Sequence, residues 1–424
     1  MTQHRHTIPK GANATASVTD PDLTLYAKTV QVQTESANRI AADTALGARV
    51  TKLEVSMANA LLRIAAVEAH FTPTVTPPPT RPFAAPVTTG TYTVPGTITH
   101  DGSADAAAAL ATFITGVPNG SIVAFPAGGT YLLNSGLSIS GRNNLVFQGN
   151  GSILHVNGSP SSMWNDAFVL YGPTTTDIAI SGFTILGNNP GTGSDMYDSS
   201  NEGQPGIGVY GALRVEIIGN TFLHAWGDGV YVGDEPTGTG TWADYLWVHA
   251  NTFDYIGRNA FTVNAAQNVW LQANSIDHVG GSVLDIEPDT DTQGVDALTM
   301  SENTVGAWGM SSSQYTMHFA ACASQWEGPS STVNGVTITG NTVSGGPPNT
   351  ANNVNSGGLY TWIGKPARQT AIVFTGNSTT HSHGGSDSVM RFEHCDGLTI
   401  GSNTQPKTAG ALYAVTDCTS VVGP

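Results

Sequence analysis

The sequence predicts an all-β fold, a wide parallel β-helix of stacked coils, preceded by an N-terminal α-helical coiled-coil stem. Two observations predict it: a strand phrase that returns through residues 145–405, and a heptad repeat within residues 32–71. A short strand motif that recurs every few dozen residues indicates one supersecondary unit stacked many times. The 50 glycines and the low charged content, 11%, fit a chain with many tight turns.

The chain before residue 89 divides into three predicted segments. Residues 1–31 have little periodicity, and we interpret them as a leader that attaches to a partner. Residues 32–71 are predicted to form the coiled-coil stem, and residues 72–88 are so rich in proline that they predict a stiff, extended linker. The stem's apolar residues follow alternating steps of four and three, which is heptad spacing; they are Leu46, Val50, Leu53, Met57, Ala60, Ile64, Val67 and Phe71.

The heptad register also suggests how chains associate. With Val50 at position a, Arg49 lies at g and Glu54 at the following e, as expected between parallel, in-register chains. The core residues do not choose between a dimer and a trimer. The alternative is a single amphipathic helix packed on its own domain.

Residues 89–424 are predicted to form the β-helix head. Apolar residues such as Val215 and Ile217 alternate, so each copy of the phrase is interpreted as a strand with one inward face. We expect the Asn that follows to adopt left-handed backbone at a sharp bend and to stack on the Asn of the next coil. The minimum spacing of 23 residues suits a coil of three short strands, and longer spacings indicate insertions. The repeated residues are Asn150, Asn220, Asn251, Asn274, Asn303, Asn341, Asn377 and Asn403.

The segment that precedes the first full coil narrows the fold further. Residues 97–156 contain His100-Asp101-Gly102, then Asp105, an Ala-rich stretch, the run Ala124-Phe125-Pro126-Ala127-Gly128, Thr130-Tyr131 and Gly149-Asn150-Gly151. These features resemble the opening of the pectate-lyase-like (pectin-lyase-like) right-handed β-helix superfamily, which is common in phage tail spikes. We expect Ser103 to cap a helix that runs to about Ile114 and covers the open end of the solenoid.

That resemblance covers about residues 95–424. It implies a right-handed, single-stranded parallel β-helix and, by analogy with tail fibres and spikes, a trimer. It does not imply one activity, because the superfamily includes lyases, hydrolases and non-enzymatic adhesins.

Charge separates the head from the rest of the chain. Residues 1–88 hold eight Lys and Arg against six Asp and Glu, whereas residues 89–424 hold seven against 25. A head with a net charge of −18 lacks the basic stripe that nucleic acids require. Neutral glycans are easier ligands for it than polyanionic ones, which would need a bridging cation.

The remaining compositional features concern redox state and location. Cys395 and Cys418 each precede a strand by three residues, and we expect them to stack as small buried side chains, with a disulfide as the alternative. The chain has no run of 18 apolar residues, and MTQHRHTIPK lacks the apolar core of a signal peptide. A β-helix without such a signal suits a virion protein made in the host cytoplasm and released by lysis.

Aligning the coils on their Asn residues suggests a catalytic face. Asp285 and Glu287 should point outward from one strand, roughly 7 Å apart, a separation that suits the acid and base of an inverting glycosidase. Asp228 should lie on a neighbouring row, beside Asn259 and Ser282. These three carboxylates are the catalytic candidates, and the alternative is a solvated acidic face. For a lyase, Arg258 and Arg391 are the best placed basic residues, although no clear lyase pattern is present.

A second row of residues is a candidate glycan-binding surface. Asp254 and Asp277 should stack in consecutive coils, with His224, Tyr255 and His278 in the next row, and Tyr231 and Trp226 complete the set. Tryptophans near turns offer faces on which sugars stack, or else they pack under long loops; they are Trp226, Trp242, Trp308, Trp326 and Trp362. A further, weaker cluster consists of His381, His383, Arg391, Glu393 and His394.

Metal binding is a second hypothesis for part of the acidic face. Asp285, Glu287, Asp289 and Asp291 alternate along the chain, and hard oxygen ligands at alternate positions suit Ca²⁺. The spacing does not match an EF-hand. No other cofactor is predicted.

The sequence therefore predicts a phage tail fibre or tail spike, a minor tail protein that docks to other virion tail proteins through its N-terminus. Its trimeric β-helix is expected to bind a polysaccharide of the host surface. The alternatives are an active depolymerase, either a hydrolase or a lyase, and a purely structural tail component.

Overall fold

The computed structural model describes residues 80–158, 165–235, 240–311, 320–322, 331–345, 360–363, 368–379, 390–404 and 413–423, with six positions between Gln31 and Arg39. The chain divides into two units, residues 1–78 and 79–424. In the first unit the six described positions are helical. The predicted leader, the heptads from Leu46 to Phe71 and the linker up to residue 79 otherwise lie outside the described residues.

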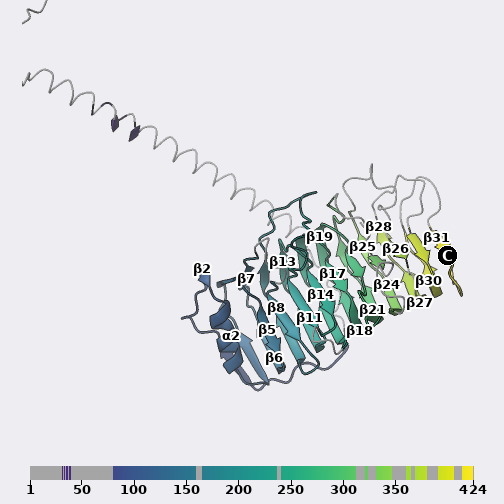
Figure 1. The fold of residues 1–424 in the computed structure, drawn as a ribbon, viewed down its shortest axis with the longest axis horizontal. Helices are drawn as coiled ribbons and strands as arrows, with labels where there is room; N and C mark the ends of the chain where they lie inside the picture. Colours follow the sequence, from purple (N-terminus) through teal and green to yellow (C-terminus); the bar gives the residue numbers. More distant parts are fainter. Residues whose placement is uncertain are drawn as a thin grey trace, which may run out of the picture. The chain divides into compact units, whose positions relative to one another are not determined.

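The second unit is a parallel β-helix made of three long sheets (Figure 1). Successive strands of the chain fall in turn on the three sheets, and every named pairing between strands is parallel. Each coil therefore contributes one short strand to each sheet, as the spacing of the asparagines predicts. The right-handed course that parallel crossovers almost always take stays a prediction.

Within each sheet the strands follow one another along the stack in chain order. Sheet A consists of β1 (Gly90–Thr93), β3 (Ser121–Ala124), β6 (Asn143–Gln148), β9 (Thr176–Ser181), β12 (Leu213–Ile218), β15 (Ala243–His249), β18 (Ala265–Gln272), β21 (Gly294–Ser301), β24 (Thr332–Thr339), β27 (Gln369–Thr375) and β30 (Cys395–Gly401). Sheet B consists of β2 (Asp101–Asp105), β4 (Thr130–Leu133), β7 (Ile153–Val156), β10 (Thr184–Leu186), β13 (Thr221–Leu223), β16 (Thr252–Ile256), β19 (Ser275–Val279), β22 (Thr304–Val305), β25 (Thr342–Val343) and β28 (Ser378–Thr379). Sheet C consists of β5 (Leu137–Ser140), β8 (Phe168–Tyr171), β11 (Ile207–Tyr210), β14 (Val230–Gly233), β17 (Phe261–Val263), β20 (Leu284–Ile286), β23 (Ala320–Cys322), β26 (Tyr360–Ile363), β29 (Met390–Glu393) and β31 (Tyr413–Thr416).

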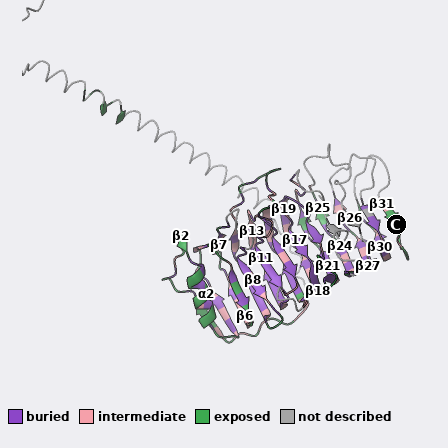
Figure 2. Cartoon of the chain, viewed as in Figure 1, coloured by how far each residue is buried: buried purple, intermediate pink, exposed green. Residues whose placement is uncertain are grey.

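The core runs through the middle of the stack, because alternate side chains of all three sheets point inward. Figure 2 shows the buried residues along the strands of the stack. Like residues stack in successive coils. Phe222 and Phe253, for example, lie parallel with ring centroids 4.6 Å apart. Every coil therefore packs against its neighbours above and below, which is how a solenoid is stabilised.

The asparagine ladder forms as predicted, but its backbone geometry differs. From Asn220 to Asn377, each main-chain N–H and each side-chain Nδ2 donates to Oδ1 of the Asn in the next coil, at 2.9–3.1 Å. The prediction of left-handed backbone at the Asn is wrong for these residues. Positive φ belongs to the preceding residue, such as Ala250 or Ala273, which turns the chain so that the Asn side chain points into the stack.

The capping helix is present, but it begins later than the sequence suggests. Helix α2 spans Ala107–Gly116, with Ala106 at its N-cap and no side-chain cap. Ser103 lies in β2, where the chain pairs with β4, so it cannot cap the helix. The Asp105 carboxylate instead accepts from the Ala107 N–H at 3.0 Å. Leu110 and Ile114 are buried in the core, and Figure 1 shows the helix at the β2–β4 end of the stack.

The described part of the predicted linker lies on the head. Arg81 forms an ion pair with Glu216, and Phe83 contacts Tyr245 and Trp270 at ring centroid distances of 6.3 and 6.5 Å. The Val87 N–H donates to the Asn144 side chain at 2.9 Å. Residues 80–88 are therefore a strap across the outer face of sheet A rather than a free spacer.

Two smaller predictions concern the cysteines and the membrane. Cys395 and Cys418 are free thiols in adjacent coils, and the Cys395 N–H lies 3.4 Å from Cys418 Sγ, so they stack without a disulfide. Cys395 is buried and Cys418 is half-buried. Within the described residues, no helix has both the length and the apolar character that crossing a membrane requires.

Candidate functional site

The outer face of sheet C gathers the predicted catalytic residues. Register pairs Tyr231 of β14 with Thr262 of β17, and Thr262 with Asp285 of β20. The flanking residues on these strands, such as Val230 and Leu284, are fully buried in the core, so the three named residues face outward. This orientation follows from strand geometry, because successive side chains of a strand point to opposite faces. This outer face is nevertheless shielded from solvent, as the exposed fractions show: Thr262 is 0% and Asp285 only 5% exposed.

A ladder of polar side chains precedes these strands. The Asp228 carboxylate accepts from the Asn259 N–H at 3.0 Å, and Asn259 Oδ1 accepts from the Ser282 N–H at 2.8 Å. Asn259 Nδ2 also donates to Asp285 Oδ2 at 3.3 Å. Asn259 thus joins two of the three predicted catalytic carboxyls, in the row that the sequence alignment of coils suggests.

Arg258 connects the third candidate carboxylate, Glu287, to this network. Its guanidinium contacts Asp228 Oδ2 at 3.4 Å and forms an ion pair with Glu287. Burial alone would lower the pKa of Arg258, but the carboxylates of Asp228, Glu287 and Asp285 raise it well above its ordinary value. The side chains of Arg258 and Glu287 are 15% and 23% exposed, so this pair is where the network reaches solvent.

Burial changes the acidity of the carboxyl groups behind that pair. Asp228 is 0% exposed, and burial raises its pKa to about 6, although Arg258 acts in the opposite direction. Burial and then the nearby charge of Glu287 raise the pKa of Asp285 well above its usual range. Among the residues that the structure describes, Asp285 Oδ1 has no hydrogen-bond partner. A buried carboxyl without a partner at one oxygen favours the protonated, neutral form.

The sequence did not reveal the extension of this network toward β8. Asp166 is 2% exposed, and burial followed by the charge of Asp228 raises its pKa well above the ordinary value. The rings of Tyr171, Tyr210 and Tyr231 form a ladder on the same face, with centroids 5.4 and 5.7 Å apart. A signal was available, because Asp166 precedes β8 by the same two residues by which Asp228 precedes β14.

The insertion between β10 and β11 covers part of this face, at the turn before β14. Within it, the Tyr197 hydroxyl donates to Glu202 at 2.7 Å. The main-chain oxygen of Glu202 lies so close to Gly227 that a Cβ there would stand 2.1 Å from it. This segment therefore lies directly against the turn that carries Asp228.

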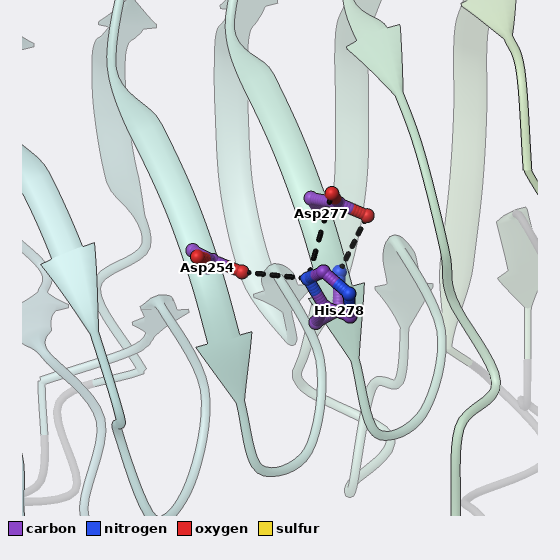
Figure 3. A group of neighbouring side chains, drawn as sticks. All are labelled: Asp254, Asp277 and His278. Carbon is purple, nitrogen blue, oxygen red and sulfur yellow. Dashed lines mark hydrogen bonds and ion pairs between the residues drawn. The ribbon is translucent and has the colours of Figure 1, made fainter. Parts of the chain in front are cut away.

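The second predicted row lies on the outer face of sheet B. Asp254 pairs in register with Asp277, as expected. The ring of Tyr255 stacks between those of His224 and His278, with centroid distances of 5.0 and 4.5 Å. Figure 3 shows the carboxylates of Asp254 and Asp277 both directed at His278. His278 Nδ1 lies 2.8 Å from Asp254 Oδ1 and 3.4 Å from Asp277 Oδ2. This row and the network around Arg258 belong to different sheets.

The proposed calcium ligands are bound to protein partners. Asp285 accepts from Asn259, Glu287 pairs with Arg258, and Asp289 accepts from Asn264 Nδ2 at 2.5 Å. Among the described residues, these three and Asp291 do not converge as a group of metal-ligating atoms; the group that does is Asp254, Asp277 and His278.

The tryptophans and the weaker cluster of His, Arg and Glu residues differ in how far they are buried and in what they contact. Trp308 is 1% exposed and belongs to the core. Trp242 is half-buried and donates to the Thr292 carbonyl at 2.8 Å, while Trp226 is half-buried and lines a small cavity with Asn165. His394 forms an ion pair with Asp417. The side chains of Trp326, Trp362, His381, His383 and Arg391 lie outside the described residues.

One solved structure supports the fold, and two others are similar to this chain at lower scores. An alginate lyase from Paenibacillus sp. str. FPU-7 is similar at a TM-score of 0.53 and 13% identity, over 79% of this chain and 99% of that one. The tailspike protein of Acinetobacter baumannii phage AM24 has a TM-score of 0.41 at 13% identity, over 72% of this chain and 53% of that one. The Streptococcus pneumoniae surface adhesin PfbA has a TM-score of 0.45 at 13% identity, over 76% of this chain and 90% of that one.

At these identities the likeness concerns the fold, and the alginate lyase alone of the three exceeds a TM-score of 0.5. This chain spans about half the length of the AM24 tailspike. No protein-family model matches the sequence, and no curated protein is similar to it. The class that the structure defines is a parallel β-helix of three sheets.

Proposed function

We propose that this chain is a phage tail-spike or tail-fibre protein whose head binds a neutral polysaccharide of the host surface. The observation that carries the proposal is the polar network on sheet C, buried for most of its extent and open to solvent at Arg258 and Glu287. Such a network holds its donors and acceptors in place before a ligand arrives, which lowers the entropic cost of binding hydroxyl groups. Tyr231, half-buried beside it, offers part of an aromatic ring.

Charge supports a neutral ligand. The guanidinium of Arg258 is already compensated by Asp228 and Glu287, and residues 89–424 carry a net charge of −18. A polyanion would meet repulsion at this face, whereas hydroxyl groups can donate to Glu287 and accept from Arg258. The trimer, the coiled-coil stem, N-terminal docking to other tail proteins and a virion location belong to the same proposal.

The second candidate is a depolymerase that acts at the same face. The raised pKa values of Asp228 and Asp285, beside the ion-paired Glu287, support it, because glycosidases combine a protonated carboxyl with an ionised one. Burial weighs against it: Asp228 has no exposed surface and Asp285 only 5%. Catalysis would require the covering segment to move away, whereas binding at Glu287 would not.

Purified protein incubated with cell-wall and capsular polysaccharides distinguishes these candidates. Binding without shortening of the chains is the expected result. Shortened chains with new reducing ends, lost in Asp285→Asn, would replace the binding proposal with a hydrolase. Shortened chains with ultraviolet absorbance of unsaturated ends would indicate a lyase. Neither binding nor cleavage across a broad panel would favour a purely structural tail component.

Point variants locate the binding face. Glu287→Gln keeps the shape of the side chain but removes its charge, and we expect roughly tenfold weaker binding, or about 1.4 kcal/mol. Asp296→Asn is the matched control, because Asp296 lies on sheet A, where its carboxylate accepts a hydrogen bond from Asn334 Nδ2 at 2.6 Å. Equal affinities for the two variants would contradict the assignment of this face.

A further inference from the structure

Asp254, Asp277 and His278 form a compact group of potential metal ligands on sheet B. Asp254 lies on β16, and Asp277 and His278 lie on β19 in the next coil. One ligand atom from each residue lies within 4.8 Å of the other two. The group contains both an imidazole and carboxylates, so it differs in kind from the acidic surface that surrounds it.

One of two distances in the group matches the geometry of a bound ion, and the other is shorter. Tetrahedral zinc has bonds of about 2.0–2.1 Å to nitrogen and oxygen, which places neighbouring ligand atoms roughly 3.3 Å apart. His278 Nδ1 and Asp277 Oδ2 are 3.4 Å apart, close to that separation. Nδ1 and Asp254 Oδ1 are 2.8 Å apart, a hydrogen-bond length. Exchange of the Nδ1 proton for a cation requires this second distance to open by about half an ångström.

A cation would satisfy the group better than a proton does. The imidazole Nδ1 carries at most one proton, yet carboxylate oxygens of Asp254 and Asp277 both face it. One N–H can make a short hydrogen bond to only one of them, as the unequal distances show. A divalent ion at the same place would bind Nδ1 and both carboxylates together and would compensate two negative charges.

The surroundings hold the ligands in position. Asp277 Oδ1 accepts from the main-chain N–H of Ala307 at 2.6 Å and from that of His278 at 3.0 Å, so Oδ2 is left toward the imidazole. This position needs Gly306, because a Cβ there would stand 2.3 Å from Asp277 Oδ1. The His278 ring stacks on Tyr255 at an interplanar angle of 0°. Such outer contacts orient metal ligands and tune their affinity.

The donor set also selects the kind of metal. Imidazole nitrogen with two carboxylates suits zinc and similar transition ions, whereas calcium prefers six to eight oxygens. The three side chains are 22–41% exposed, so an ion can enter, and three protein ligands leave a fourth position open.

We propose that Asp254, Asp277 and His278 bind a divalent transition-metal ion of the zinc class, which links consecutive coils of the β-helix. The metal site is independent of the proposed polysaccharide site, because its ligands lie on sheet B and the polysaccharide site uses other residues, on sheet C.

Metal titration of the full chain tests the proposal. The protein is stripped with a chelator and titrated with Zn²⁺ by calorimetry, and with Co²⁺ while the visible absorbance of tetrahedral cobalt is recorded. We expect the parent to bind one more equivalent than His278→Gln, or to bind that equivalent at least tenfold more tightly. Asp277→Asn should show the same loss. Histidines elsewhere in the chain, such as His4 and His6, remain in every variant and cancel in the comparison.

His155→Gln is the matched control. His155 also lies on sheet B, where its Nε2 meets Asn188 Oδ1 at 2.6 Å, outside the proposed site. This variant should bind metal as the parent does. Circular dichroism establishes that each variant retains its strands. A parent with the same stoichiometry and affinity as folded His278→Gln and Asp277→Asn would overturn the proposal, as would equal losses in His155→Gln.

Discussion

Substitution of Asn274 by alanine tests whether the asparagine ladder stabilises the β-helix. Asn274 Oδ1 accepts from the main-chain N–H of Asn251 at 3.0 Å and from its Nδ2 at 3.1 Å. Its own Nδ2 donates to the Val248 carbonyl and to Asn303 Oδ1, each at 3.0 Å. Asn274 is 1% exposed, so water cannot replace these partners. At about 0.5–1.5 kcal/mol for each hydrogen bond, the loss should be about 4 kcal/mol.

Two assays read this loss. Urea unfolding should give a lower midpoint with an unchanged slope. Hydrogen exchange measured by mass spectrometry should show faster exchange in peptides that contain Asn251, because its N–H loses its acceptor. Asn334→Ala is the control. This Asn makes two side-chain hydrogen bonds on the outer face of sheet A and is half-buried. At the same value for each hydrogen bond, the substitution should cost about 2 kcal/mol or less. Similar losses in the two variants would show that the buried ladder stabilises the fold no more than an outer-face contact does.

Burial and close contacts lead to three further predictions. Burial raises the pKa of Asp228 to about 6 in the folded protein, so on raising the pH the unfolded chain loses this proton before the folded protein does. The free energy of unfolding should therefore fall by up to about 3 kcal/mol as the pH rises from about 4 to 6. Urea titrations of the parent and of Asp228→Asn check this, because the decline should be smaller in the variant. Gly280→Ala places a Cβ 2.0 Å from a backbone oxygen of the preceding coil, so the variant should unfold at lower urea or fail to fold. Gly116→Ala should not, because the described part of the chain places no contact within 4 Å of the added Cβ. Unfolding of Gly280→Ala at the parental midpoint would contradict the close approach. Phe83→Ala removes the ring that contacts Trp270, so proteolysis at residues 80–88 should accelerate while the far-ultraviolet circular dichroism spectrum stays the same. An unchanged cleavage rate would argue against the strap.

Periodicity explains why much of the fold could be predicted. The rows of Asn220, Asn251 and Asn274 and the inward positions of Val230 and Leu284 follow from counting residues, because stacked coils repeat the same positions. The left-handed residue before each Asn could have been found in part, because Gly219, Gly340 and Gly376 carry positive φ in the same row and glycine favours that conformation. Ala250 and Ala273 carry positive φ, although nothing in alanine's preferences indicates it; the need to point the next side chain into the stack decides the conformation.

The sequence indicated which residues form the candidate site better than it indicated how deeply they are buried. Alternation placed Asp285 and Glu287 on an outer face, and the structure brings both to the network around Arg258. The covering segment between β10 and β11 comes about a hundred residues earlier and has no periodic pattern that would indicate where it lies. The strap at residues 80–88 escaped prediction for a similar reason, since prolines indicate an extended chain but not the surface on which it rests.

The affinity of the intact protein for host-surface polysaccharides, measured beside Glu287→Gln and Asp296→Asn, decides whether sheet C carries a glycan-binding face. We predict that the parent and Asp296→Asn bind the same neutral polysaccharide with equal affinity, without shortening it, and that Glu287→Gln binds roughly tenfold more weakly. A parent that binds none of a broad panel, or a Glu287→Gln variant that binds as tightly as the parent, would contradict this prediction.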